Sequence, residues 1–401
     1  MISTASKVGT GNIAGIAQAL VVGGPGAMFW MWIMSIFSSA SAIVENTLAQ
    51  MYKTVNDDGV SFRGGPSYYI QKALGKRNIG ILFSILLIIS FAYGFNALQS
   101  HTISSSLDYY IKDYNNTIWP LVVGIILAAA TAFIIFGGIH RISFISSAIV
   151  PIMAGMYLIL GIYIIIVNIE KMPYVVSSIL KEAFNFRAIF SGFAGSALSI
   201  GIKRGLLSNE AGMGSSPNVV AAADTSHPAK QGILQILSVF IDTILICSTT
   251  AFIVLLSSPN LDGHVSGIPL IQQCLKSQIG PWGIHFITFS IFTFAFSSVV
   301  GNYCYAESNL LFIKDNPYIL KIFRISCIIP VILGSIANAK IVWNIADISM
   351  GLMSIVNIVA IILLSKKFLI CLNDYSEQYK LGKDPIFNAP KCKIYDTEVW
   401  K

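Results

Sequence analysis

Long apolar segments recur along the whole chain and are separated by short polar stretches. About ten of them hold roughly 20 mostly apolar residues, the length that an α-helix needs to cross the hydrocarbon core of a bilayer. The expected spans lie near residues 2 to 20, 25 to 51, 78 to 107, 118 to 137, 143 to 168, 186 to 202, 231 to 257, 282 to 313, 319 to 338 and 341 to 365. This pattern predicts an all-α polytopic membrane protein.

Three further segments are not expected to span. Residues 64 to 74 and 268 to 278 are short and amphipathic, which favours helices that lie at the membrane surface. Residues 366 to 401 are too polar, and too often interrupted by proline, to form another span. We therefore treat residues 1 to 401 as a single transmembrane domain with a tail at its carboxyl end.

The first span is apolar enough for a membrane but is interrupted by glycine in the sequence SKVGTGNIAG. Gly9, Gly11 and Gly15 each destabilise a helix by about 1 kcal/mol relative to alanine. Unwound backbone within a bilayer is tolerated only where it is buried in protein or lines a cavity. In transporters such a break offers carbonyl groups to a cation and N–H groups to an anionic substrate group. The alternative is a helix thinned by glycine so that a neighbour packs closely.

The two halves of the chain have a related pattern. Five spans precede residue 168 and five lie between about residues 185 and 365, so the odd number in each half inverts the second set relative to the first. The first helix of each set contains glycine, in SKVGTGNIAG and in SGFAGSALSIGIKRG. Interrupted helices at matching positions of two inverted halves predict a 5+5 inverted repeat with a binding site near the middle of the membrane, a rule drawn from the leucine-transporter-type fold among others.

Composition and charge agree with a membrane protein. The chain is 55% hydrophobic and only 11% charged, whereas soluble chains carry roughly 25% charged residues. The net charge of +7 does not indicate a nucleic-acid partner, because no soluble segment is long enough to carry a basic face. Instead Lys and Arg gather in alternate loops, which predicts cytoplasmic termini in the plasma (inner) membrane. The loops assigned to the inside hold Lys53, Arg63, Lys72, Lys76, Arg77, Arg141, Lys203, Arg204, Lys230, Lys314, Lys321 and Arg324.

Motifs of other functional classes are missing from the sequence. There is no HExxH, GxSxG or P-loop, and the histidines are scattered over different segments, so an enzyme is not indicated. No CxxC pair or organic-cofactor motif is present either. A channel would more plausibly show rings of charge or a repeated filter sequence.

Several long motifs carry a family resemblance. They are GTGNIAG, GGPGAMFWMW, GGPSYYI, KRGLLSNEAGMGSSPN, FAFSSVVGNYCYAESN and VWNIADISMGLMSIVNIVAIILLS. Over nearly its whole length the chain resembles the alanine or glycine:cation symporter family, also called sodium:alanine symporters. The resemblance implies sodium-coupled import of a small neutral amino acid by alternating access, in a leucine-transporter-type fold. We expect a monomer in the lipid bilayer, with Na⁺ as the coupling ion.

The chain departs from this family at its beginning. Members usually carry a longer segment before GTGN, with an additional helix, whereas only eight residues precede Gly9 here. A first half-helix that short is expected to seal the cytoplasmic side poorly. Two alternatives to this function stay open. One is a truncated or non-transporting homologue of such a symporter, and the other is a proton-coupled amino-acid transporter.

A zwitterionic substrate needs partners for both of its charges, because burying either one alone costs several kcal/mol. The N–H groups at the first break are expected to hold the carboxylate, and carbonyl groups around Phe193 to Ala197 are expected to accept from the ammonium. Phe193 would form an apolar wall, although ordinary helix packing explains it equally well. The predicted substrate-binding residues are Thr10, Gly11, Asn12, Phe193, Gly195 and Ser196.

Sodium requires oxygen ligands. Ser297 and Ser298 stand side by side in an otherwise apolar span. By analogy with the fold, their hydroxyl groups would join the carbonyl groups of Ala5 and Val8 to form the metal site. The alternative is that each serine bonds back to a carbonyl of its own helix, as serines within spans often do.

Other polar residues within the spans are candidates for function, since each is expensive in a bilayer. Structural roles are favoured for Glu45 and Glu307, whereas Asp242 and Asp347 are undecided. Asn96 and Gln99 lie on one face of the third span, where they would line the pathway or bond to another helix. Asn12 would face either the substrate or a second cation.

Overall fold

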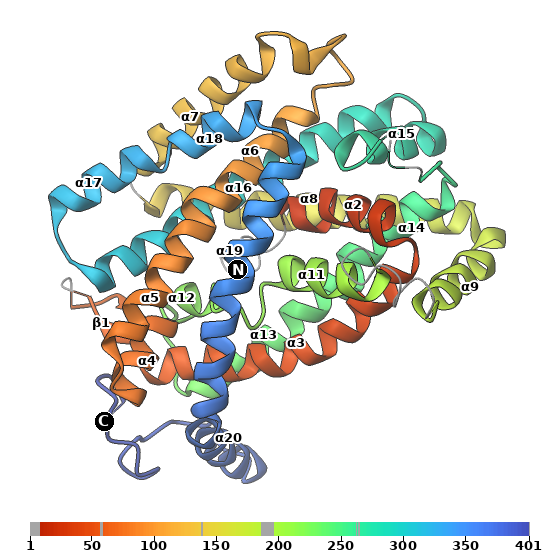
Figure 1. Ribbon diagram of the computed structural model, residues 1–401. Coiled ribbons are helices and arrows are strands. Elements are labelled where there is room, and N and C mark those ends of the chain that lie inside the picture. Colours follow the sequence, from red (N-terminus) through yellow and green to blue (C-terminus); the bar gives the residue numbers. More distant parts are fainter. Residues whose placement is uncertain are drawn as a thin grey trace.

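The structure is a computed structural model that describes residues 9–56, 59–137, 139–185, 196–261, 263 and 265–400, with the backbone alone for residues 139–149. Nearly all of this chain is helical (Figure 1). A two-stranded antiparallel sheet pairs β1 (Thr54–Val55) with β2 (Phe62–Arg63).

Eight helical segments in the described chain are long and apolar enough to cross a membrane, and each matches an expected span. Two of them contain an internal π-helical turn, labelled η2 and η6. The segments are α3 (Gly26–Met51), α5–η2–α6 (Arg77–Leu87, Ile88–Phe95, Asn96–Ser105), α7 (Trp119–Gly137), α8 (Ile139–Val167), α13–η6–α14 (Pro228–Phe240, Ile241–Cys247, Ser248–Leu256), α16 (Trp282–Ile313), α17–α18 (Pro317–Ser326, Ile329–Ile336) and α19 (Ala339–Leu363).

The two spans expected to be broken are present as short helices. The first consists of the 3₁₀ turn η1 (Thr10–Asn12) and α2 (Ala14–Gly23). The described part of the sixth lies in α11 (Ala197–Asn209), and α12 (Ser216–Val220) follows it. Residues 1–8 and 186–195, which belong to the expected first and sixth spans, lie outside the described residues. The count of ten helices therefore stays a prediction.

Shorter helices connect the spans. The amphipathic segments expected near 64–74 and 268–278 form α4 (Pro66–Leu74) and α15 (Ile268–Ile279), which confirms both as short helices. The remaining connecting elements are η3 (Tyr114–Asn116), η4 (Ile169–Lys171) and α9 (Met172–Ala183).

The spans pack in two main groups. In the first group α2, α3, α11 and α13 lie against one another, and in the second group α6, α7, α16 and α18 do so, while α19 runs alongside both (Figure 1). Glycine permits close contact within each group: a side chain on Gly201 would collide with the backbone of Ala27, and one on Gly334 with the backbone of Ala97. Close approach at small residues is how helices pack in membranes.

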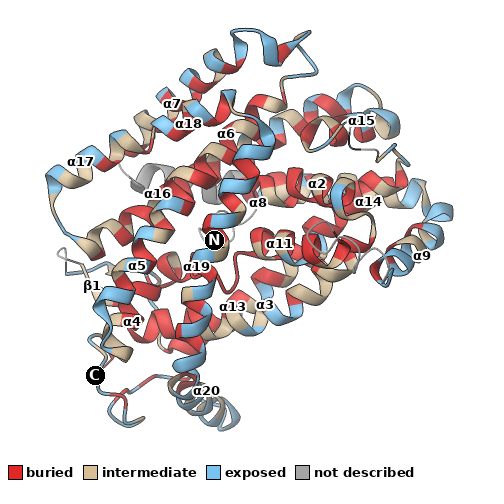
Figure 2. Ribbon diagram, in the orientation of Figure 1, coloured by how far each residue is buried: buried red, intermediate tan, exposed pale blue. Residues whose placement is uncertain are grey.

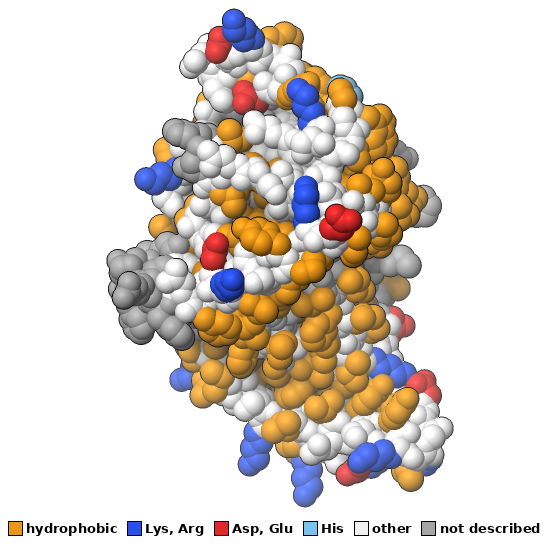
Figure 3. Space-filling view, turned by 90° about the vertical axis from the view of Figure 1, so that its right-hand side faces the viewer, with side chains coloured by type: hydrophobic (Ala, Val, Ile, Leu, Met, Phe, Trp, Pro, Cys, Tyr) orange, Lys and Arg blue, Asp and Glu red, His pale blue; other side chains and the backbone are white. Residues whose placement is uncertain are grey.

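The surface is apolar where lipid would lie. Many large hydrophobic side chains are exposed, including Ile36, Phe37, Phe133, Ile159, Ile348 and Ile355. Figure 3 shows hydrophobic side chains across much of the middle of one face, with several Lys and Arg side chains at its lower end. The buried residues gather on the inner sides of the spans, whereas α20 and α17 are largely exposed (Figure 2). A soluble monomer rarely exposes so much apolar surface, so the protein is a multi-pass membrane protein.

The tail is folded rather than extended. It comprises α20 (Ser365–Lys380) and a segment reaching residue 400, and it is not a candidate span. The indole of Trp400 donates to the carbonyl of Gln50 at 2.8 Å, at the end of α3. The ring of Trp400 also lies 5.0 Å from the ammonium of Lys53, whose pKa is lowered to about 8 by burial. An ion pair of 2.8 Å joins Glu398 to Lys72 of α4.

The close contact of α18 with α6 predicts the result of one substitution. A Cβ atom on Gly334 would lie 2.2 Å from the carbonyl oxygen of Ala97. Overpacking of this kind typically destabilises a protein by about 1 to 3 kcal/mol, so Gly334→Ala should lower the melting temperature of the purified protein in detergent. Gly351→Ala is the matched control, since nothing lies within 4 Å of its new Cβ atom. Equal melting temperatures for the two variants would contradict this account of the packing.

Candidate functional site

The described residues of the expected first break are not α-helical. Gly9 is extended, Thr10–Asn12 form a single 3₁₀ turn, and the α-helix starts only at Ala14. The N–H of Asn12 donates to the carbonyl of Gly9 at 3.3 Å. It is therefore already occupied, although it was one of the N–H groups expected to hold a substrate carboxylate.

A break that was not expected follows α11. In the described residues α11 runs without interruption from Ala197 to Asn209, and the chain then unwinds until α12 begins at Ser216. Glu210, Gly212 and Gly214 all have positive φ angles, of 54°, 84° and 82°. We call this segment, NEAGMGS, the second break. The break expected around 193 to 197 stays a prediction, because residues 193–195 lie outside the described residues.

A small cavity lies where the first break meets α11. Its volume is about 20 Å³, enough for one water-sized occupant. Four segments contribute to its wall: the first break, the third span, the end of α11 and α16. The lining residues are Gly9, Thr10, Gly11, Phe95, Leu98, Gln99, Leu207, Glu210 and Asn302.

Buried polar atoms at this cavity lack partners. The hydroxyl of Thr10 and the side-chain carbonyl oxygen of Gln99 are buried and accept or donate no hydrogen bond within the described chain. One turn before Gln99, the side-chain oxygen of Asn96 accepts from Asn302 at 3.0 Å, and the amide nitrogen of Asn96 is likewise unpaired there. An unpaired buried polar group costs about 1 to 3 kcal/mol. Buried polar atoms without partners are typical of a site that binds a polar ligand.

Asn12 points away from this cavity. Its amide nitrogen donates to the carboxylate of Asp242 at 2.5 Å, and its main-chain carbonyl accepts from Thr250 at 2.8 Å. Asp242 lies in the π-helical turn η6 and also accepts from the hydroxyl of Ser208 at 2.6 Å. Thr10 and Gly11 thus line the cavity as predicted residues, whereas Asn12 contacts the seventh span instead.

The paired serines differ in their position. Both hydroxyl groups donate to the carbonyl of Phe294, Ser297 at 2.8 Å and Ser298 at 3.0 Å, as serines within spans often do. Ser298 nevertheless reaches the first break, because its oxygen lies 2.6 Å from the place where a Cβ atom of Gly9 would be. A hydroxyl that donates one bond keeps lone pairs for a cation.

Ser196 is the one remaining predicted site residue that the structure describes. Ser196 caps the start of α11, where its hydroxyl oxygen accepts from the N–H of Ser199 at 3.3 Å. This end of α11 lies beside Gly23, at the far end of α2 from Thr10. Ten residues of α2 span about 15 Å, so Ser196 does not line the cavity. Phe193, Gly195, Ala5 and Val8 lie outside the described residues, and their roles stay predictions.

Arg204 forms a buried ion pair. The expectation that Lys203 and Arg204 belong to an inner loop is wrong, since both lie within α11. The guanidinium of Arg204 donates to both carboxylate oxygens of Asp347 on α19, at 2.9 and 3.0 Å. It also lies 4.4 Å from the ring of Trp343. A paired charge is tolerated in the membrane where a single charge is not.

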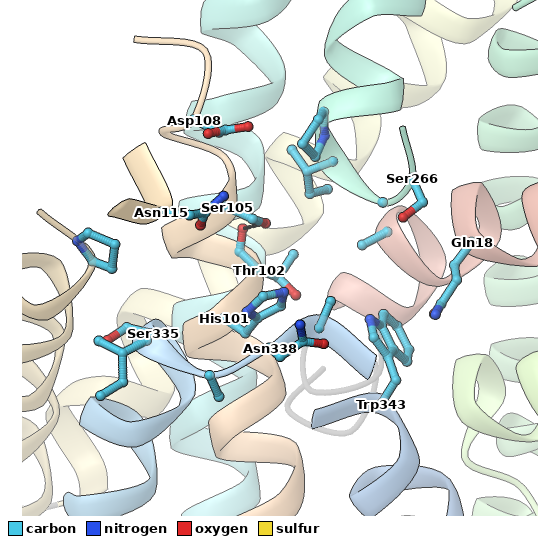
Figure 4. A pocket seen from close by; sticks show the side chains of 18 of the residues that line it. Gln18, His101, Thr102, Ser105, Asp108, Asn115, Ser266, Ser335, Asn338 and Trp343 are labelled. Carbon is cyan, nitrogen blue, oxygen red and sulfur yellow. Dashed lines mark hydrogen bonds between the residues drawn. The ribbon is translucent and has the colours of Figure 1, made fainter. Parts of the chain in front are cut away.

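A much larger hollow opens beyond α2. Its volume is about 700 Å³, and it is lined by α2, α6, α7, α15 and the junction of α18 with α19. In Figure 4 the side chains of His101 and Trp343 point into the same space, with Gln18 beyond Trp343 on α2. Trp343 also lies 3.5 Å from the Cβ position of Gly15. We call this hollow the vestibule.

Comparison with known proteins assigns the chain. The sequence pattern of the sodium:alanine symporter family matches residues 1–389. The amino-acid carrier protein AlsT of Bacillus subtilis is 48% identical over 403 residues, which cover 100% of this chain and 84% of that protein. The sodium/alanine symporter AgcS of Methanococcus maripaludis is 35% identical, over 91% of this chain and 80% of that protein. The chain belongs to the sodium:alanine symporter family.

A solved structure supports the fold. A crystal structure of a manganese transporter from Eremococcus coleocola matches with a TM-score of 0.55, covering 96% of this chain and 81% of that one. The sequence identity is only 11%, so the likeness concerns the fold alone. The family and its relatives make the protein a membrane transporter and not an enzyme.

The sequence contains signals for two further cavity residues. Gln99 shares one face of the third span with Asn96, which predicts a place in the pathway or a bond to another helix. Asn302 follows Ser298 by four residues on an apolar helix, a spacing that puts both on one face. No local pattern marks Leu207 and Glu210 as cavity residues, because only the fold brings the end of α11 to the first break.

The contact of Gly9 with Ser298 predicts the effect of filling it. The φ angle of Gly9 is −132°, which any residue adopts, so glycine is needed here for space alone. Gly9→Ala should displace the hydroxyl of Ser298 and weaken any sodium site beside it. A ligand that binds the folded state raises its stability, so the wild type should melt at a higher temperature in NaCl than in KCl. This difference should be largely lost in Gly9→Ala and kept in Gly351→Ala; a full difference in Gly9→Ala would refute the placement.

Proposed function

We propose that this protein is a sodium-coupled symporter that imports small neutral amino acids such as alanine or glycine by alternating access. Family membership supports amino-acid transport with sodium. Relatives differ in substrate: one is named a probable sodium/glutamine symporter, at 45% identity. The choice of a small substrate therefore rests on the site itself.

The observation that carries the proposal is the cavity at the first break. The hydroxyl of Thr10 and the side-chain oxygen of Gln99 are unpaired within the described chain, and both residues line the cavity together with Glu210. Oxygen acceptors suit an ammonium group, while the nearby amide nitrogen of Asn96 suits a carboxylate. Phe95, Leu98 and Leu207 would enclose a short apolar side chain.

The size of the cavity favours a small substrate. At about 20 Å³ it is too small for any amino acid without movement of its walls. Alanine or glycine demands the least movement. Because one additional methylene is worth only about 1 to 3 kcal/mol in such a pocket, larger substrates should be disfavoured in steps rather than excluded.

Ser298 supports the sodium assignment. Its hydroxyl lies against Gly9 in the first break, where carbonyl groups of the preceding residues would complete a set of oxygen ligands. We propose that Ser297, Ser298, Ala5 and Val8 form this site. It adjoins the substrate cavity, so binding of the ion and of the substrate would influence each other.

The arrangement of the spans supports alternating access. Helices of the first and second halves pack together in two groups, spans 1 and 2 with spans 6 and 7, and spans 3 and 4 with spans 8 and 9. This is what ten helices in a 5+5 inverted repeat would produce, and movement of one group against the other would expose the site to each side in turn.

The orientation follows from the loops. The vestibule is lined by loops that the Lys and Arg distribution assigns to the outside. The tail packs against β1 and α4, on the side assigned to the inside. We therefore propose a monomer in the plasma membrane, with both termini in the cytoplasm and the vestibule open to the exterior.

Glu210 favours proton coupling as a second candidate. The expected breaks contain no carboxylate that could carry a proton, which favours sodium. The second break, however, contains the carboxylate residue Glu210, which lines the cavity. A relative from Bacillus sp. strain PS3, at 34% identity, is named a sodium/proton-dependent alanine carrier protein. Labelled alanine uptake into proteoliposomes, driven by a sodium gradient or by a pH gradient alone, separates the two. Uptake that follows the pH gradient and ignores sodium would reject sodium coupling.

The paired hydroxyl groups give a direct test of the ion site. Replacing Ser297 and Ser298 together by alanine removes two oxygen ligands, so the sodium concentration for half-maximal alanine uptake should rise at least severalfold. Ser290→Ala is the matched control, because that serine bonds back to Phe286 in the same helix at 2.8 Å. An unchanged sodium dependence in the double variant would remove these serines from the site.

Gln99 gives a test of the substrate site. Gln99→Met keeps the volume but removes the unpaired carbonyl oxygen. A hydrogen bond to a charged group is worth about 1.5 to 3 kcal/mol, so the KM for alanine should rise about tenfold or more. Gln235→Met, in α13, is the control of the same residue type. If both variants transport with the wild-type KM, Gln99 does not contact the substrate.

A further inference from the structure

Glu45 lies outside the cavity but holds the second break. It is fully buried in α3, and its two carboxylate oxygens accept from the N–H of Gly212 at 3.0 Å and of Gly214 at 3.1 Å. These N–H groups belong to unwound backbone with positive φ angles. In an apolar interior such groups need partners, and Glu45 supplies them from a neighbouring helix.

Asn357 of α19 completes the arrangement. Its amide nitrogen donates to the carboxylate of Glu45 at 2.7 Å and to the carbonyl of Gly212 at 3.0 Å. The hydroxyl of Tyr69 in α4 donates in turn to the side-chain oxygen of Asn357. Both polar atoms of the Asn357 side chain are thus used, and α3, α4, α19 and the second break meet at one carboxylate.

The glycines of the second break lie against neighbouring side chains. A Cβ atom on Gly214 would lie 2.6 Å from Pro66 and 2.8 Å from Phe83. One on Gly212 would lie 3.4 Å from Ser41 of α3. The break is therefore enclosed by side chains on one side and fixed by Glu45 on the other.

The backbone that Glu45 holds is connected directly to the cavity wall. Glu210, which lines the cavity, directly precedes Ala211 and Gly212. A shift of the Gly212 peptide would carry Glu210 and the end of α11 with it. We propose that Glu45 is a positioning residue for substrate binding: without touching the substrate, its carboxylate sets the cavity wall formed by Glu210 and Leu207. This inference rests on the proposed transport of alanine.

Glutamine cannot replace Glu45 in this role. The carboxylate accepts from two peptide N–H groups and one amide, whereas glutamine has a single acceptor oxygen. The NH₂ group of glutamine would face the N–H of Gly212 or of Gly214, and two donors cannot bond to each other. Glu45→Gln keeps the size of the side chain and removes only this capacity, which makes it the informative variant.

The test separates positioning from general stability. In proteoliposomes, Glu45→Gln should raise the KM for alanine about tenfold or more, with a smaller change in kcat, because misplaced contacts weaken binding. Glu307→Gln is the matched control: Glu307 is also a buried span carboxylate, paired with Arg324 at 3.1 Å, but it does not line the cavity. It should keep the KM of the wild type. A KM that is unchanged in Glu45→Gln, or raised equally in Glu307→Gln, would overturn the proposal.

A second variant, Asn357→Ala, tests the proposal even if Glu45→Gln does not fold. Asn357→Ala leaves the carboxylate and both glycine contacts in place, so it should raise the KM less than Glu45→Gln. If both fold, their combination should raise the KM less than the product of the single effects, because they act on one contact. Fully multiplicative effects, or a wild-type KM in Asn357→Ala when Glu45→Gln is unfolded, would refute the shared role. If the wild type itself shows no sodium-driven alanine uptake, the proposed function fails instead.

Discussion

A peptide group that leaves a helix inside a bilayer has no water to bond with, and this constraint determines the centre of the molecule. The first break satisfies it partly within itself, through the bond from Asn12 to Gly9, and partly through Thr250. The second break satisfies it through the carboxylate of Glu45. The cavity lies between the two breaks, where the polar atoms of Thr10 and Gln99 have no partner in the described chain.

The spans and the first break could be predicted from the sequence, because both depend on local composition. Runs of apolar residues identify spans, and three glycines between residues 9 and 15 are enough to disfavour a helix. The second break could not be placed in this way, since SGFAG and NEAGMG both contain glycine. The contact that stabilises the second break comes from Glu45, far away in the sequence. Likewise nothing local shows that Asn12 faces Asp242 on the seventh span.

Charges in the spans illustrate the same limit. A count of Lys and Arg assumes that these residues lie between the spans, which holds for Arg63 of β2 and Lys72 of α4 but not for Arg204 of α11. Arg204 is accommodated within the protein because Asp347 approaches it from α19, and Glu307 is paired in the same manner with Arg324. Each pair turns two expensive charges into one neutral contact. The intramembrane carboxylates are therefore explained by partners on other helices, which only the folded chain brings together.

The unequal sizes of the vestibule and the cavity have an electrical consequence. A hollow of about 700 Å³ filled with electrolyte carries the potential of one bathing solution deep into the membrane, while a space of about 20 Å³ cannot. The transmembrane field is therefore concentrated over the thinner layer of protein beyond the vestibule. If the proposed ion site beside Ser298 adjoins the inner end of the vestibule, an ion that leaves it towards the opposite side would cross most of this field, at about 2.3 kcal/mol per charge for each 100 mV. In this conformation the membrane voltage would then act chiefly on the release of the ion and only weakly on its arrival.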